Sequence, residues 1–245
     1  MKLTWLSDIH LEFLTMDRAR RFFARVKQGR PDAVLITGDI STATELRHHL
    51  RLVAETLSCP TYFVLGNHDV YSGSFAKVDS VVGAVCRDFP RLHPLGNGEI
   101  VPLTAKTALI GHRSWADGRA GLGKRSTIRL NDYTLIADFR ELDQDVLFAR
   151  LQQLGDESAA YIDGVAREAH KKAETLVIGT HVPPFTEVAL YEGQPSAPDL
   201  APHFVNVPSG KSFVCWPAIF LRRNSSSCAA TLITPLFTSR HPTSR

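Results

Sequence analysis

Five short apolar runs in this sequence each end in residues that bind metal ions well. The polar ends supply carboxylate, imidazole and amide groups, and they are 7–10, 38–39, 66–69, 111–112 and 179–181. Such mixed nitrogen and oxygen ligands suit Mn, Fe, Zn or similar divalent metals. Two of these cations about 4 Å apart can clamp a phosphate, activate a bridging hydroxide and stabilise the leaving oxygen. The residue types are therefore those that such a two-metal site needs.

The spacing of these residues suggests how they divide between two ions. Asp8 and His10 lie two apart at a strand end, so their side chains face one side of an extended chain and can chelate one ion. Asp39 follows the neighbouring strand and is the natural bridge between the ions. Asn67 offers an amide oxygen to the second ion, and His181 offers a ring nitrogen.

The other histidines have different expected roles. His68 adjoins Asn67 and cannot easily reach the same ion, so a phosphate contact or a general acid for the leaving oxygen is predicted for it. His112 ends a strand-like run and has either a structural or supporting role or, as the alternative, a place in the pocket as a substitute ligand or substrate contact. His203 and His241 lack a strand-end context and are expected to bind no metal. The remaining histidines are predicted to be solvated, and they are His48, His49, His93 and His170.

The apolar runs predict the elements that must position these groups. They read as strands buried on both faces, at Leu3–Leu6, Ala33–Ile36, Tyr62–Leu65, Ala108–Ile110 and Leu176–Ile178. Helical periodicity predicts helices over Met16–Lys27, Leu46–Leu57 and Glu157–Lys172, and Thr42 with Glu45 resembles a capping box. Alternating strands and helices predict an α/β fold. Because ligands bind beyond the carboxyl ends of such strands, the polar ends should converge.

One segment between the motifs is predicted to be a long loop. It runs from Arg113 to Asn131, with several glycine and alanine breaks and few large apolar residues. Trp115 in this loop either walls the pocket or packs against the protein.

Four motifs in register resemble those of the calcineurin-like metallophosphoesterases. They are Asp8-Ile9-His10, Gly38-Asp39, Gly66-Asn67-His68-Asp69 and Thr180-His181. The resemblance covers about residues 1 to 211. It implies a double β-sheet sandwich flanked by helices in α-β-β-α layers, two divalent metal ions, and hydrolysis by a metal-bridging hydroxide. The family's metal ligands carry over to Asp8, His10, Asp39, Asn67 and His181, and its catalytic histidine carries over to His68.

The sequence departs from this family pattern near its C-terminal end. The family has a Gly-His-x-His motif that completes both ions, but none follows His181. From Leu200 to Arg245 there is no acidic residue, and no helical or strand period is evident. We therefore expect a metallophosphoesterase domain over 1–211 and an atypical tail over 212–245 that is either disordered or the product of a shifted reading frame or a gene rearrangement.

Composition excludes several other classes of protein. The chain is 44% hydrophobic and 22% charged, enough for a sizeable core. A net charge of +3 argues against a dedicated nucleic-acid binder, and no apolar run approaches the roughly 20 residues of a membrane span. Four scattered cysteines and no apparent signal peptide favour the cytoplasm. The expected partner is a small phosphoester, and nothing indicates an oligomeric state.

Two alternatives to an active phosphoesterase for small substrates follow from these observations. The missing histidine pair favours a catalytically impaired family member that acts as a metal- or protein-binding module. A nuclease would keep the fold and the metals, but gripping a polyanion usually takes a basic groove, and the charge is nearly balanced.

Overall fold

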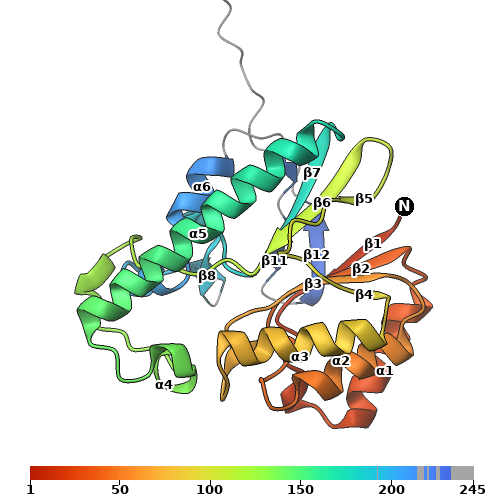
Figure 1. Ribbon diagram of the computed structural model, residues 1–245, viewed down its shortest axis with the longest axis horizontal. Coiled ribbons are helices and arrows are strands. Elements are labelled where there is room, and N and C mark those ends of the chain that lie inside the picture. The colour runs from red at the N-terminus through yellow and green to blue at the C-terminus, as the bar shows by residue number, and fades with distance from the viewer. Residues whose placement is uncertain (192, 214–217, 220, 225–226, 233–245) are drawn as a thin grey trace, which may run out of the picture.

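Two four-stranded sheets form the centre of the molecule (Figure 1). The computed structural model describes residues 1–191, 193–213, 218–219, 221–224 and 227–232. The first sheet is entirely parallel, in the order β1-β2-β3-β4. Its strands are β1 (Leu3–Leu6), β2 (Ala33–Thr37), β3 (Thr61–Val64) and β4 (Leu92–Pro94).

The second sheet has the order β10-β7-β6-β5. Its strands are β5 (Val101–Pro102), β6 (Thr107–His112), β7 (Thr175–Thr180) and β10 (Ala218–Ile219). All neighbours are parallel except β5, which runs antiparallel to β6. Two antiparallel ribbons complete the described strands, and they are β8 (Leu190–Tyr191) with β9 (Gln194–Pro195), and β11 (Leu221–Asn224) with β12 (Ser227–Leu232).

Alternation along the strands explains why the runs are apolar throughout. In β2, Leu35 packs with Leu109 and Val177 of the other sheet. Its neighbours Val34 and Ile36 point the opposite way, into the core beneath the helices. Because successive side chains of a strand face opposite sides, a sheet covered on both sides needs apolar residues at every position.

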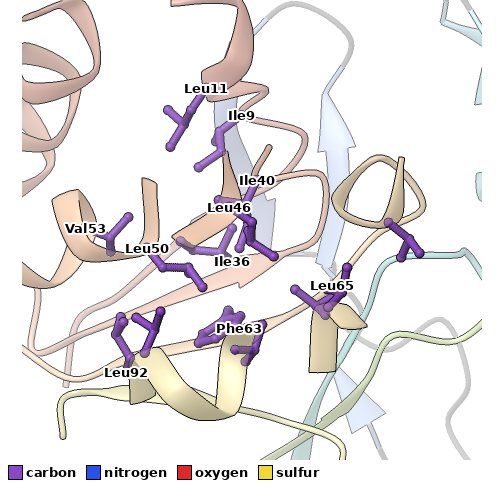
Figure 2. Close-up of a cluster of buried hydrophobic side chains, with 14 of the residues drawn as sticks. Ile9, Leu11, Ile36, Ile40, Leu46, Leu50, Val53, Phe63, Leu65 and Leu92 are labelled. Carbon is purple, nitrogen blue, oxygen red and sulfur yellow. The ribbon is translucent and has the colours of Figure 1, made fainter. Parts of the chain in front are cut away.

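Three helices cover the outer face of the first sheet, and they are α1 (Met16–Gln28), α2 (Leu46–Thr56) and α3 (Phe75–Asp88). Figure 2 shows this core, in which Leu50 and Val53 of α2 lie over Ile36 and Phe63 of the sheet. The predicted inward face of this helix is confirmed. The predicted capping box is wrong, because the helix begins only at Leu46 and the side chain of its N-cap residue makes no capping hydrogen bond.

The long helix α5 (Gln144–His170) covers the second sheet (Figure 1). Ile162 and Ala166 pack there against Ile110, while Leu147 and Leu151 join the core of the first sheet. The predicted helix from Glu157 was therefore too short. Its apolar face changes partner part-way along, so the sequence shows no single stripe. The layers are α-β-β-α, as predicted.

The remaining helices are short. Two are α-helices, α4 (Asp132–Leu135) and α6 (Val207–Phe213). The described single turns of 3-10 helix are Leu11–Phe13, His68–Val70, Gly123–Arg125, Ala137–Phe139, Thr186–Val188 and Ala201–His203. Within the described part of the chain, no helix has the length and apolar character needed to cross a membrane.

The C-terminal region contains strands that its composition does not reveal. No strand period is evident in this sequence, yet β10 extends the second sheet and β11 pairs with β12. The last described residue is Leu232, so His241 lies outside the described residues. An origin of the tail in a shifted reading frame stays a prediction.

Candidate metal centre

The first two motif loops have an unusual backbone that holds them together. Asp8, His10 and Asp39 all have positive φ, at 50°, 41° and 50°. Few residues other than glycine adopt this conformation, and such positions cluster at functional sites. The backbone N–H of His10 donates to the carbonyl of Asp39 over 3.0 Å, and that of Asp8 donates to Gly38 over 3.2 Å. The loops after β1 and β2 therefore form one unit.

Asp69 ties the second loop to the third. Its buried carboxylate accepts hydrogen bonds from the backbone N–H groups of Ile40 (2.9 Å), Ser41 (2.8 Å) and Gly66 (2.8 Å). Burial, together with the nearby charge of Asp39, raises the pKa of Asp69 to about 7, although the backbone hydrogen bonds oppose this. The last residue of the Gly-Asn-His-Asp motif thus fixes the loops that carry the others.

Two glycines allow the three loops to approach closely. A Cβ atom on Gly66 would lie 2.1 Å from Oδ1 of Asp39 and 2.8 Å from Cε1 of His181. A Cβ atom on Gly38, whose φ is 89°, would lie 2.5 Å from Nδ1 of His181. Any larger residue at either position would separate Asp39 from His181. The close approach of the loops therefore requires glycine at both positions.

Two groups of potential ligands share Asp39. Among the described residues, Asp8, Asp39 and His181 form one group, and His10, Asp39 and His68 form the other. Within each group the ligand atoms lie within 4.8 Å of one another. Carboxylate and imidazole donors at this spacing, with one carboxylate common to both, fit a pair of divalent ions.

Asn67 and His181 meet at this centre from separate loops. Nε2 of His181 lies 3.0 Å from Oδ1 of Asn67 and 3.4 Å from Oδ1 of Asp39. Its other nitrogen, Nδ1, lies 2.9 Å from the carbonyl oxygen of Thr37. Burial alone would lower the pKa of His181, but the carboxylates of Asp39 and Asp8 raise it overall. The ring is thus oriented by the backbone, with Nε2 turned toward the proposed ligands.

The structure brings all six predicted site residues into this region. The grouping differs from the expected division, because Asp8 clusters with His181, and His10 clusters with His68. The rings of His10 and His68 are 4.7 Å apart. The chelation of one ion by Asp8 with His10 stays a prediction, as do the individual roles of the six residues.

Glu12 is a residue of this site that the sequence analysis missed. Its Oε1 lies 3.1 Å from Nδ1 of His10 and 3.8 Å from Nδ1 of His68. The side chain is 8% exposed, and Oε2 is buried without a hydrogen-bond partner. A carboxylate that accepts from one ring nitrogen leaves the other nitrogen free to bind a metal. Its position two residues after His10 was the available signal.

The other described histidines have mainly structural surroundings. His203 is buried, with Nε2 2.9 Å from Oγ of Ser126 and Nδ1 2.5 Å from the hydroxyl of Tyr133. The prediction that His49 is solvated is wrong, because it is 2% exposed and its Nδ1 lies 2.6 Å from Oγ of Ser41. Its neighbour on the helix, His48, is exposed as expected.

The long loop after β6 is anchored by packing. Trp115 is 5% exposed, and its ring contacts Phe75 edge-on and Phe139 at a tilt. Of the two roles expected for it, Trp115 therefore has the packing role. Asp117 is fully buried and pairs with Arg119 over 2.9 Å. These contacts fix the start of the loop against the helical layer.

His112 should make stability depend on pH. Ser114 donates its backbone N–H to Nδ1 of His112 over 3.0 Å, and burial, with Arg113, lowers the pKa of His112 from 6.5 to about 4. Between pH 4 and 6.5 this histidine binds more protons in the unfolded chain than in the folded chain. Its contribution to stability is therefore fully present above pH 6.5 and is lost as the pH falls toward 4. We expect a loss of about 2 kcal/mol from this residue between about pH 7.5 and 5.

Urea unfolding of the His112→Gln variant at both pH values measures this effect. The variant should lose less stability on acidification than the parent chain. His48→Gln, which alters an exposed histidine, serves as the control and should leave the pH dependence unchanged. An equal acid sensitivity in the parent and in His112→Gln would contradict the prediction.

Known proteins resemble this chain in sequence pattern and in fold. Residues 1–209 match the family model described as calcineurin-like phosphoesterase. The phosphopantetheinyl hydrolase from Mycobacterium tuberculosis has a similar fold, with a TM-score of 0.66, 13% sequence identity, and coverage of 94% of this chain and 87% of that one. A dimetal phosphatase from Danio rerio is also similar, with a TM-score of 0.53, 13% identity, and coverage of 95% and 86%.

These findings carry different weight. A comparison with curated proteins finds no match. The two solved structures, at 13% identity, show the fold. The family model spans most of the sequence and includes all four motifs. The chain belongs to the calcineurin-like phosphoesterase family.

Proposed function

We propose that this chain is a metal-dependent phosphoesterase that hydrolyses a small phosphomonoester or phosphodiester. The observation that carries the proposal is the position of Asp39. Its carboxylate belongs to both groups of ligand atoms, and it is 7% exposed. Its position between His10 and His181 lets one carboxylate face both groups, which suits a ligand shared by two cations.

The residues proposed to hold two divalent ions are Asp8, His10, Asp39, Asn67 and His181. The bound ions, Mn, Fe, Zn or similar, would supply positive charge to the phosphate oxygens and activate the attacking water. The backbone hydrogen bonds of the strand-end loops and the glycines beside Asp39 preorganise these donors, so binding requires little rearrangement.

His68 is proposed to donate a proton to the leaving oxygen. Its backbone N–H donates to Oδ1 of Asp39 over 3.0 Å, which ties the residue to the centre of the site. Its ring stacks on Tyr71 with the centroids 4.2 Å apart, and Glu12 faces Nδ1. The stacking restricts the ring, and a ring held beside the centre of the site can donate a proton to a leaving oxygen.

The proposed setting is the cytoplasm. Cys59 and Cys86 are both free thiols, which suits a reducing compartment. A small phosphoester is favoured over nucleic acid because the net charge is only +3.

Hydrolysis of aryl phosphodiesters with Mn²⁺ tests the proposal. We expect turnover that depends on Mn²⁺ and is removed by a chelator. The His68→Ala variant should lose about 100- to 10,000-fold in rate. The loss should be larger for a phenyl ester than for a p-nitrophenyl ester, because the more basic leaving group needs the proton more.

A matched variant controls for the change of a histidine to alanine. His48→Ala alters an exposed position on α2 and should keep full activity. Equal losses for both esters in His68→Ala would contradict the acid role. Absence of Mn²⁺-dependent hydrolysis of either ester and of the corresponding monoesters would contradict an active phosphoesterase.

A second candidate is a catalytically impaired family member that acts as a metal- or protein-binding module. The observation that favours it is the missing Gly-His-x-His motif after His181. His203 does not replace either lost ligand, since both of its ring nitrogens contact hydroxyl groups. Binding of Mn²⁺ without turnover of any of these esters would support this second candidate.

A further inference from the structure

Asp132 contacts a proposed metal ligand from a part of the chain that carries no family motif. It is the first residue of α4 and is 7% exposed. Its Oδ1 accepts hydrogen bonds from Nδ2 of Asn67 over 2.9 Å and from the hydroxyl of Tyr71 over 2.6 Å. The aspartate lies 65 residues after Asn67 in the chain. No pattern in the sequence predicts this contact.

These hydrogen bonds determine which way the amide of Asn67 points. An amide side chain has a donor end and an acceptor end, and Oδ1 of Asp132 accepts the hydrogen bond of the donor end. The NH₂ group of Asn67 must therefore face Asp132. Oδ1 is left on the opposite side, 3.0 Å from Nε2 of His181. The reverse orientation would present N–H groups to the space between His181 and Asp39, and these groups repel a cation.

Asp132 is itself held in a fixed place relative to Asn67. The backbone N–H of Ser72 donates to the carbonyl of Leu135 over 2.9 Å, and that of Ala137 donates to Gly73 over 2.9 Å. The carboxylate of Asp138 accepts from the backbone N–H of Phe75 over 3.0 Å. The short helix is thus bonded to the same loop that follows Asn67, so both residues move together.

We propose that Asp132 is a positioning residue that keeps the amide oxygen of Asn67 directed at the metal centre. The inference rests on the proposed function, because it assumes that Asn67 is a metal ligand. Tyr71 supports the arrangement, since its hydroxyl bonds to Asp132 and lies 3.3 Å from Nδ2 of Asn67. Asp132 acts through Asn67 and is not itself a ligand in this arrangement.

Calorimetric titration with Mn²⁺ tests this role through two variants of one residue. Asp132→Leu removes both acceptor oxygens while keeping the branched shape of the side chain, and it should weaken Mn²⁺ binding about 10- to 100-fold, as is typical for residues that orient metal ligands. Asp132→Asn retains a carbonyl oxygen that can accept from Asn67, so it should bind Mn²⁺ within a few-fold of the parent. High Mn²⁺ should restore much of the activity of Asp132→Leu.

Tyr71→Phe covers the case in which Asp132→Leu does not fold. It removes one donor to Asp132 and leaves Asn67 in place, so a smaller weakening of Mn²⁺ binding is expected. If Asp132→Leu folds and its Mn²⁺ affinity is unchanged, the positioning role is overturned and the proposed function stays intact. If Asp132→Leu does not fold, an unchanged Mn²⁺ affinity in Tyr71→Phe has the same consequence. A parent chain that binds no Mn²⁺ would overturn the proposed function and, with it, this inference.

Discussion

Asp39→Ala should lose both metal binding and phosphoesterase activity. The carboxylate of Asp39 is common to both groups of ligand atoms, so its removal weakens both proposed ions. Loss of a residue that merely orients a ligand costs about 10- to 100-fold in affinity or activity. Because Asp39 is a proposed ligand of two ions, we expect a loss of roughly 100- to 10,000-fold in kcat/KM. Metal analysis and hydrolysis of an aryl phosphodiester measure the two losses.

Two further variants show that the loss comes from the metal centre. Asp39→Asn retains a carbonyl oxygen that can accept from the backbone N–H of His68, so it preserves the fold but still removes the negative charge. It should be nearly as inactive as Asp39→Ala. Asp17→Ala removes a carboxylate on α1 that is 77% exposed and should be fully active. Two bound ions in Asp39→Asn would contradict the bridging role.

Gly66→Ala should disrupt the site by adding one methyl group. The new Cβ would lie 2.1 Å from Oδ1 of Asp39, 2.6 Å from its backbone nitrogen and 2.8 Å from Cε1 of His181. The backbone nitrogen of Asp39 and the ring atom of His181 cannot move away without separating the loops after β2 and β7. Because Asp39 and His181 are both proposed metal ligands, we expect Mn²⁺ affinity and kcat/KM to fall about 100-fold or more. The free energy of unfolding should fall by about 1–3 kcal/mol.

Gly83→Ala is the matched control for this substitution. Gly83 lies in α3, and the nearest atom to an added Cβ is Nη1 of Arg87 at 3.7 Å, an ordinary contact with a flexible side chain. Alanine favours helix more than glycine does, so this variant should be fully active and slightly more stable. Wild-type Mn²⁺ affinity in Gly66→Ala would mean that the loops are not as closely packed as described.

The strands that carry the site could be predicted from the sequence because they are short apolar runs, fully buried in β2 and mostly half-buried in β1. A continuous apolar run as short as Ala33–Ile36 favours a buried strand, and the observed β2 extends this run by one residue, Thr37. The short strands β4 and β5 were missed. Each contains proline and has at most three residues, so neither leaves a periodic pattern.

The motif residues could be predicted for a different reason. Their chemistry is rare at strand ends, and parallel strands place those ends together. Glu12 and Asp132 could not be assigned in this way, since their partners are set by loop conformation and by a contact across 65 residues. His49 was misjudged because its polar contact with Ser41 compensates for its burial within a helix.

The location of bound metal tests the central claim most directly. We predict that crystals grown with Mn²⁺ will show two anomalous peaks about 3.5–4 Å apart. Both peaks should lie within coordination distance of the Asp39 carboxylate, with Asn67 and His181 beside one of them. A single peak that does not contact Asp39, or no peak at this site at saturating Mn²⁺, would contradict the account.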